Sequence, residues 1–273
     1  MDLLLDNLFD GYICDDDDRE RAAIYMIESW RNINNLLDKE IFCDVTLLTN
    51  DEKSIKAHKI ILSSSSTYFE NLIADNGNEY KLDVTYFALK TVLYFLYNGF
   101  IETESIDVVE NISEIFDAID IMDFNDLGYY MRDKIRNIMK YYRKRGLKIY
   151  EKLRERFKTK TDKYSIMNEV ERAIGNYIKE YFKKKNFKKI ISVDTMYNIL
   201  NIHVYEYPDG FERCKMSEMC NMLIEWITEY PNDAKRLIPA IRWSYVSSEM
   251  LKELKDNPII KESGHDIIEL SKK

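Results

Sequence analysis

Residues 41–48 read IFCDVTLL, residues 55–62 read IKAHKIIL and residues 66–69 read STYF, and these three stretches decide the fold of this chain. In the first stretch, apolar residues recur at every second position, so that they would share one face of an extended chain. This is the period-two pattern of a β-strand. The polar cluster at 49–52 predicts a turn. Because the alternation resumes after this turn, the sequence predicts a β-hairpin.

A short helix and a further strand are expected after the hairpin. Ser66 or Thr67 can cap the helix, and Glu70 stands at capping-box distance from Thr67. Leu82 and Val84 then suit a short strand, because they alternate with polar neighbours.

Two longer helices complete this part of the chain. Apolar spacing predicts a helix that begins near residue 87 and ends at Asn98, where Gly99 can adopt the left-handed C-terminal conformation. A second amphipathic helix is predicted over 112–122. The order of hairpin, helices, strand and helices is that of a mixed α/β module.

The motifs CDV at 43–45, AHK at 57–59 and STYF at 66–69 resemble the signature of the BTB (POZ) domain. The resemblance implies an α+β protein with a BTB/POZ domain over 21–130. Domains of this family recruit other proteins and dimerise, so it also implies that the chain is not an enzyme and needs no cofactor.

Length and composition agree with a folded protein of about two domains. The 273 residues are 45% hydrophobic and 13% aromatic, which argues against global disorder. The 8 glycines leave little room for a β-propeller. The start of the chain lacks the basic region of a secretory signal, and the four cysteines form no metal-ligand spacing. We therefore expect reduced thiols, no membrane-spanning segment and a cytoplasmic location, with the nucleus left open.

Charge divides the chain into two halves. Residues 1–131 hold 9 Lys and Arg against 27 Asp and Glu, whereas residues 132–273 hold 31 against 21. The shift predicts a domain boundary near residue 130. Basic residues concentrate over 132–163, where they either form the solvated faces of two helices that meet around Gly146, or bind an acidic partner surface, or bind nucleic acid.

The second half resembles the BACK domain, an all-α helical domain. Residues 219–227 resemble the helix of that domain that ends in a tryptophan, here Trp226. Residues 241–243 read IRW and resemble its following turn, and residues 247–251 resemble the short helix after it. We expect Trp226 and Trp243 in the core, a BACK helical domain over 131–260 and a C-terminal tail over 261–273.

The BTB-BACK pair is similar to the first part of Kelch-type adaptors of cullin-3 ubiquitin ligases. No glycine-rich repeats of about 50 residues occur, so the Kelch propeller has no counterpart in the sequence. The richness in Asn, Lys, Ile and Tyr is typical of a poxvirus member. The resemblance implies cullin-3, a second copy of the chain and an unidentified ubiquitylation or sequestration target as partners.

By resemblance, cullin-3 would bind the helix that carries STYF, the loop after it and the end of the helix before Gly99. The corresponding residues are Tyr68, Phe69, Leu72, Ile73, Glu79, Tyr97, Phe116 and Ile119. For Phe69 and Leu72, core packing is the alternative, whereas Tyr97 is expected as a surface anchor. Gly77 stands where an apolar side chain is expected, which predicts weakened or differently built cullin binding.

The dimer interface is expected on a helix before the CDV strand. The candidate residues have helical spacing and are Ala23, Ile24, Ile27, Trp30, Ile33, Asn34 and Leu37. The alternative is that this helix folds onto its own domain. Asp44 and His58 are expected to be buried, hydrogen-bonded structural groups and not catalysts.

The first 20 residues form an acidic segment in which Leu3, Leu4, Leu5, Leu8 and Phe9 are interspersed with aspartates. Such segments often stay disordered until a partner accepts their apolar face. The segment is therefore expected to be a disordered recruiting peptide, a swapped strand or a solvated tail.

Three functions remain as hypotheses. The first is a dimeric adaptor or competitor that binds cullin-3 and directs or diverts ubiquitin ligase assembly. The second is a BTB-mediated homodimeric scaffold that sequesters host or regulatory proteins without cullin. The third, least favoured, is a nucleic-acid-associated factor that uses residues 132–163.

Overall fold

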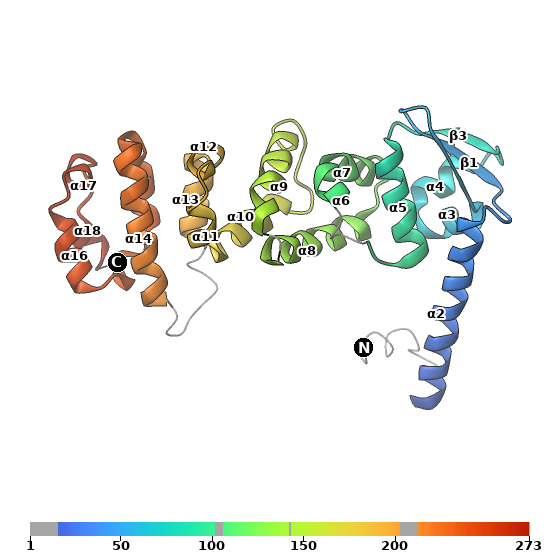
Figure 1. Ribbon diagram of the computed structural model, residues 1–273, viewed down its shortest axis with the longest axis horizontal. Coiled ribbons are helices and arrows are strands. Elements are labelled where there is room, and N and C mark those ends of the chain that lie inside the picture. Colours follow the sequence, from blue (N-terminus) through green and yellow to red (C-terminus); the bar gives the residue numbers. More distant parts are fainter. Residues whose placement is uncertain (1–15, 102–105, 142, 203–211, 273) are drawn as a thin grey trace. The chain divides into compact units, whose positions relative to one another are not determined.

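The computed structural model describes residues 16–101, 106–141, 143–202 and 212–272 (Figure 1). The chain divides into two compact units, Met1–Tyr129 and Tyr130–Lys273. The division falls inside a single helix, α8 (Asn125–Tyr141). The N-terminal unit combines strands and helices, and the described part of the C-terminal unit is helical, so the predicted α+β class is confirmed.

A three-stranded sheet with the order β2-β1-β3 organises the N-terminal unit. Strand β1 (Val45–Leu48) pairs antiparallel with β2 (Ser54–Ala57), and Val45 lies opposite Ala57. The predicted hairpin is therefore confirmed. Strand β3 (Glu79–Lys81) pairs parallel with β1. It lies earlier in the chain than predicted, because Leu82 is buried just beyond the strand and Thr85 already caps the next helix.

Six helices of this unit precede α8 in the described residues: α2 (Asp16–Asp38), α3 (Lys59–Ser65), α4 (Thr67–Leu72), α5 (Tyr86–Asn98), α6 (Ile106–Glu110) and α7 (Ile112–Ile121). Two sequence signals determine where helices begin and end. The Ser66 hydroxyl, and not that of Thr67, accepts a hydrogen bond from the Tyr68 backbone N–H and caps α4. Gly99 has φ 73° and ends α5 as predicted.

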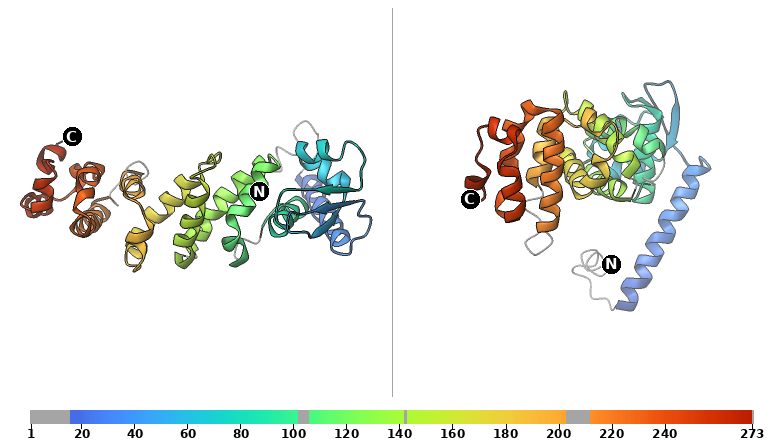
Figure 2. Two further views of the ribbon diagram at one scale, coloured as in Figure 1. Left: turned by 90° about the horizontal axis from the view of Figure 1, so that it is seen from above. Right: turned by 60° about the vertical axis from the view of Figure 1, so that its left-hand side comes forward.

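Helix α5 lies at the centre of the N-terminal unit. It contacts α2, α3, α7 and β2, and its apolar face is buried. Helix α2 contacts α5, while its N-terminal half extends away from the other elements of the unit (Figures 1 and 2). Among the described residues of this unit, no element covers the N-terminal half of α2.

The described C-terminal unit continues α8 with ten further α-helices and three 3-10 turns. The helices are α9 (Arg143–Arg156), α10 (Ile166–Asn176), α11 (Ile178–Phe182), α12 (Phe187–Ile190), α13 (Val193–Ile202), α14 (Glu212–Glu229), α15 (Ala234–Leu237), α16 (Ser248–Lys255), α17 (Pro258–Glu262) and α18 (Ile267–Leu270). The turns are η1 (Pro231–Asp233), η2 (Ile238–Ala240) and η3 (Trp243–Tyr245).

Both tryptophans of this unit lie in its core, as predicted. Trp226 and Trp243 are buried, and each indole N–H finds an acceptor 2.8 Å away. The acceptors are the Asp233 carboxylate and the Ile238 carbonyl. Burial of a large ring costs little when its one polar atom is hydrogen-bonded. Ten further apolar residues of this unit are buried as well: Ile135, Ile138, Met139, Leu147, Tyr150, Leu153, Ile174, Ile178, Phe182 and Phe187.

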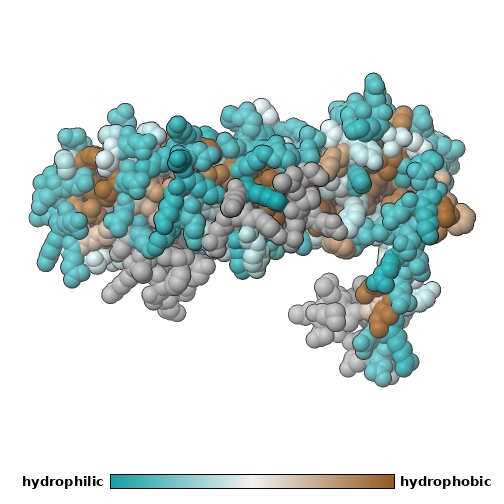
Figure 3. Space-filling model, viewed as in Figure 1, coloured by the Kyte–Doolittle hydropathy of each residue, from teal (hydrophilic) through white to brown (hydrophobic). Residues whose placement is uncertain are grey.

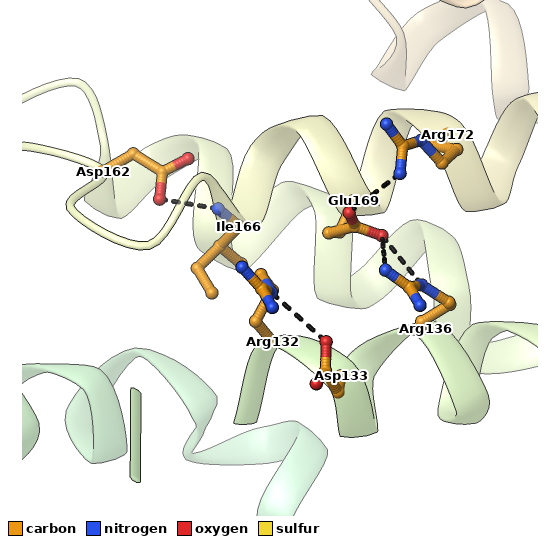
Figure 4. A network of polar contacts seen from close by, with 7 residues as sticks. All are labelled: Arg132, Asp133, Arg136, Asp162, Ile166, Glu169 and Arg172. Carbon is orange, nitrogen blue, oxygen red and sulfur yellow. Dashed lines mark hydrogen bonds and ion pairs between the residues drawn. The ribbon is translucent and has the colours of Figure 1, made fainter. Parts of the chain in front are cut away.

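A polar network joins the C-terminal part of α8 to α10 (Figure 4). The Glu169 carboxylate accepts hydrogen bonds from Arg136 at 2.9 Å and from Arg172 at 3.1 Å. At the start of α10, the Asp162 carboxylate accepts from the backbone N–H of Ile166 at 2.7 Å, and so satisfies a helix end that its own N-cap residue leaves open. Part of the basic stretch 132–163 thus has an internal role.

The structure differs from the expectations for three chain segments. Gly146 does not separate two helices but lies inside α9, against Tyr181. Residues 16–20 of the acidic N-terminal segment are helical in α2. Residues 1–15 lie outside the described residues, so the three alternatives given for this segment stay predictions. The C-terminal stretch is not a simple tail, because Ile267 is buried and α18 contacts α16 and η3.

Candidate interaction surfaces

The exposed side of α2 carries large apolar side chains. Ile24, Ile27 and Trp30 are exposed, and Ile27 exposes 59% of its surface. The other predicted dimer residues, Ala23, Ile33, Asn34 and Leu37, are half-buried. Figure 3 shows hydrophobic residues on this projecting helix. The sequence therefore places an uncovered apolar face where the resemblance implies a dimer interface.

A groove of about 760 Å³ runs between α2 and the C-terminal end of α5. Its lining includes Ala23, Met26, Ile27, Trp30, Leu96 and Phe100. One wall is held in place by a hydrogen bond of 2.9 Å from the Asn34 amide of α2 to the Asn98 amide oxygen of α5. The groove is mostly apolar, which suits an apolar polypeptide surface better than a polar ligand.

Four of the residues predicted to bind cullin-3 lie in the core of the N-terminal unit. Phe69, Tyr97, Phe116 and Ile119 are each at most 1% exposed. Because these side chains are buried in the single chain, they do not offer the exposed contact surface that the prediction requires, and their role in cullin binding stays a prediction. Ile73 is also buried. Core packing was the alternative for Phe69, and the structure favours it.

The remaining predicted contact residues lie on or next to one edge of the unit. Tyr68 and Leu72 of α4 are half-buried, and Glu79 of β3 is exposed. Burial raises the pKa of the Tyr68 hydroxyl. Of the residues predicted to bind cullin-3, these three have accessible side chains.

The loop after α4 is organised by side-chain hydrogen bonds. The Asp75 carboxylate accepts from the Gly77 backbone N–H at 3.0 Å and from the Tyr80 hydroxyl. The hydrogen bond from Tyr80 holds the pKa of Asp75 below its usual value. A Cβ at position 77 would lie 2.8 Å from the Tyr80 hydroxyl oxygen. A side chain at this position would therefore require the Tyr80 hydroxyl to move, which would disturb its hydrogen bond to Asp75.

Tyr97 has a structural role that the sequence patterns did not reveal. Its hydroxyl accepts a hydrogen bond from the His58 backbone N–H at 3.0 Å and lies 2.8 Å from Nδ1 of the same histidine. Nε2 of His58 lies 2.9 Å from the Ile41 carbonyl, which can only accept, so Nε2 carries the proton and Nδ1 accepts from Tyr97. Burial raises the pKa of Tyr97 to about 12.

This cluster contains no poised catalytic group. With its proton on Nε2, His58 cannot take a proton from Cys43, whose sulfur lies 3.7 Å from that nitrogen. Burial also raises the pKa of the Cys43 thiol, which opposes thiolate formation. His58 is thus buried and hydrogen-bonded, as predicted. Asp44 accepts from the Lys59 backbone N–H at 2.7 Å but is exposed, so its predicted burial is wrong.

A second exposed apolar feature was missed by the sequence patterns. Phe42 precedes β1, exposes 79% of its surface and has φ 60°, a conformation that bulky residues rarely adopt. Ile41 and Ile60 are exposed as well. Phe42 and Ile60 belong to the stretches that decide the fold. A periodic pattern predicts which residues share a face of a strand or helix, but not whether another element covers that face.

The described residues offer neither a metal site nor a membrane-spanning helix. Among these residues, no group of three or more His, Cys, Asp or Glu side chains lies together as a metal site would require. No described helix has the length and apolar character needed to cross a bilayer. Cys14 and His203 lie outside the described residues.

The N-terminal part of the chain matches a known domain family. The family model described as BTB/POZ domain matches residues 33–137, which include the hairpin, α3 to α7 and the first turns of α8. A protein of horsepox virus named Kelch repeat and BTB domain-containing protein 2 is 27% identical over 210 residues. That match covers 72% of this chain and 33% of the relative, so the chain spans about a third of the length of this relative.

Further similarities cover the N-terminal part alone. The Drosophila melanogaster sex determination protein fruitless is 32% identical over 112 residues, which are 38% of this chain and 12% of that protein. Among solved structures, the BTB domain of zebrafish PATZ1 is 24% identical, with a TM-score of 0.33. The BTB domain of human gigaxonin is 20% identical, with a TM-score of 0.31. These structures cover 38% of this chain and 85% and 84% of their own chains.

Proposed function

Because residues 33–137 of this chain form a BTB/POZ domain, we propose that the protein is a non-enzymatic interaction module that acts as a homodimer and binds cullin-3. In this function it directs ubiquitin ligase assembly or diverts it by competition. The observation that supports a protein-binding role best is the uncovered apolar face of α2 beside its groove with α5. Its site of action would be the cytoplasm.

The dimer would form through α2. A two-fold contact buries the same apolar patch on both copies, so each exposed side chain contributes twice. Burial of apolar surface gives roughly 25 cal/mol per Å². The face that holds Ile24, Ile27 and Trp30 provides surface of the required kind, and the half-buried residues beside it would form its rim.

The cullin contact would be made by α4, the loop after it and β3. Tyr68 and Leu72 supply partly exposed apolar surface, and Glu79 supplies a charge at the edge. Interface energy usually depends on a few anchors, each worth about 2 kcal/mol or more. With only two such anchors left on this surface, we expect measurable but moderate affinity.

The helical C-terminal unit would be a BACK domain that extends the cullin contact. Its support is the all-α character of the described residues together with the buried Trp226 and Trp243. The poxvirus relative that covers most of this chain has a name that includes Kelch repeats, and this chain matches only a third of its length.

The second candidate is a homodimeric scaffold that sequesters a host or regulatory protein without cullin. One observation favours it: Gly77 supplies no apolar side chain at the position where cullin binders of this type carry one, and the Tyr80 hydroxyl lies close to where its Cβ would be. The recruiting role of the acidic N-terminal segment remains a proposal, and its residues 1–15 lie outside the described ones.

Calorimetric titration of the full chain with an N-terminal fragment of cullin-3 separates the two candidates. If the protein is an adaptor, the titration should give saturable heat. The substitution Leu72→Asp should then lower the affinity for the cullin fragment at least tenfold, which is about 1.4 kcal/mol of binding free energy. A matched control is Lys90→Asp on the exposed face of α5, which should bind as the unaltered chain does. Absence of heat at tens of micromolar protein would favour the scaffold.

A further inference from the structure

A lysine-rich surface in the C-terminal unit lies outside everything proposed above. Lys183, Lys184, Lys185, Lys188 and Lys189 fall within seven residues at the junction of α11 and α12. They line a pocket of about 300 Å³ together with Phe182 and two glutamates of α14, Glu225 and Glu229. We call these five residues the lysine patch. Five cations against two carboxylates leave the pocket with a positive excess.

Two of these lysines are held in place by aromatic rings. The Lys184 ammonium lies 4.6 Å from the centroid of the Tyr181 ring, and that of Lys188 lies 5.1 Å from the Phe182 ring. Lys188 also pairs with Glu225 at 3.0 Å and Glu229 at 2.8 Å. Side chains that are already positioned lose less conformational entropy when a ligand binds.

The outer lysines supply the accessible charge. Lys183, Lys185 and Lys189 are exposed, and none of them forms an ion pair within 4.0 Å in the described part of the chain. Burial lowers the pKa of Lys184, because its charge has lost part of its hydration. An anion placed in this pocket would restore favourable electrostatics to that cation, while the outer lysines would attract it from a distance.

The composition of the patch selects among anionic ligands. Nucleic-acid surfaces usually combine cations with aromatic side chains that stack on bases, but here Phe182 and Phe187 are buried. Arginine, which binds phosphate through two parallel hydrogen bonds, is absent from the pocket lining. Lysine ammoniums are compact point charges that pair with single carboxylates equally well. Glu225 and Glu229 are both paired with Lys188, so the charge left for a ligand is that of the other four lysines.

We propose that the lysine patch is a docking site for an acidic segment of a partner protein, rich in Asp and Glu. Such a site would give the C-terminal unit a partner of its own, independent of cullin binding and of dimerisation through α2. Electrostatic docking of this kind contributes mainly to partner selection and to the rate of association.

Fluorescence anisotropy with the full chain tests the proposal. The probe is a labelled ten-residue peptide of alternating Asp and Glu, and the test variant is Lys183→Glu/Lys185→Glu/Lys189→Glu. These side chains are exposed, so the variant should melt at the same temperature as the unaltered chain. We expect saturable binding that weakens at least about fivefold in the variant and also weakens between about 50 and 200 mM salt, where the Debye length shortens.

The control variant is Lys235→Glu/Lys252→Glu/Lys255→Glu. It makes the same change in net charge at exposed positions of the same unit, outside the lysine patch. The control should bind the peptide as tightly as the unaltered chain. Equal losses in both variants, or no detectable peptide binding, would overturn the proposal. A labelled ten-nucleotide strand that binds more tightly than the peptide, with the same dependence on Lys183, Lys185 and Lys189, would assign the patch to nucleic acid instead.

Discussion

The Tyr97 hydroxyl links the end of α5 to the residue that follows β2. It satisfies the His58 backbone N–H and donates to the His58 ring, whose other nitrogen donates to the Ile41 carbonyl. A buried donor that loses its partner costs more than the bond itself contributes. These contacts connect positions 39 residues apart in the chain, so no local pattern could announce them.

Replacing Tyr97 with phenylalanine should therefore destabilise the N-terminal unit. The change leaves the His58 N–H without an acceptor in a buried site, for which we expect a loss of about 1–3 kcal/mol in the free energy of unfolding. Urea denaturation measures this loss. Tyr25→Phe is the control, because Tyr25 is exposed on α2. Equal stability of the Tyr97→Phe variant and the unaltered chain would contradict the role given to the hydroxyl.

Glu171 should make stability depend on pH. Burial raises the pKa of this carboxyl, although it accepts a hydrogen bond from the Asn198 amide at 3.0 Å. An exposed glutamate, as in the unfolded chain, has a pKa of about 4.3. The folded protein therefore keeps this proton to a higher pH than the unfolded chain does. Stability then falls as the pH rises through the folded pKa.

The substitution Glu171→Gln removes this titration. The variant should lose less stability between mildly acidic and mildly alkaline pH than the unaltered chain does, as measured by urea unfolding at both ends. Other groups titrate over the same interval, so the difference between the two proteins is the quantity to compare. Glu253→Gln, at an exposed position of α16, should show no such difference. The same pH dependence in Glu171→Gln as in the unaltered chain would refute the assignment.

At the scale of the secondary-structure elements, α9 packs against α11 at a glycine. Gly146 is buried in the first turn of α9, and a Cβ there would lie 1.9 Å from the Tyr181 hydroxyl oxygen and 2.7 Å from the ring carbon that carries it. Tyr181 is itself buried and cannot turn aside freely. The sequence marked this glycine as a helix boundary, whereas its small size serves a helix contact.

Gly146→Ala should destabilise the C-terminal unit despite the better helix propensity of alanine, which alone would add about 1 kcal/mol. Overpacking of a core contact typically costs 1–3 kcal/mol. Thermal unfolding of Gly146→Ala, Tyr181→Leu and the double variant forms a double-mutant cycle. Because leucine lacks the outer ring atoms, the alanine should cost little in the Tyr181→Leu background. A cost that is the same in both backgrounds would contradict the contact.

The periodicity of the sequence predicted the helices and strands well, but it did not predict which of their apolar residues face the core and which are exposed. The hairpin, α4, α5 and α7 follow from alternation, spacing and caps, which are local properties of the chain. The helix that carries Trp226 was expected from its resemblance to the BACK domain. The contact residues did not follow. Phe69 and Phe116 satisfy an apolar pattern equally well whether they face the core or a partner, and only the packing of the whole unit places them inside.

Considered as one chain, the protein combines an acidic N-terminal half with a basic C-terminal half. The acidic half presents an apolar face on α2, and the basic half presents the lysine patch. The two surfaces suit different partners, because one depends on apolar burial and the other on charge. Salt should therefore affect them differently: it screens the lysine contact and leaves the apolar contact intact.

Dimerisation is the prediction that concerns the molecule as a whole. Substituting Ile27→Asp places a charge in the centre of the α2 face, where a two-fold contact would bury it twice. We expect the unaltered chain to sediment at twice its mass of 32.6 kDa at micromolar concentration, and the variant to sediment as single chains. The variant should keep its melting profile at high dilution, because Ile27 is exposed in the single chain.

Asn32→Asp is the matched control, since it adds the same charge at an exposed position on the far side of the same helix and should stay dimeric. A dimer that survives Ile27→Asp would place the contact elsewhere, with exposed Phe42 and Ile60 as the next surface to alter.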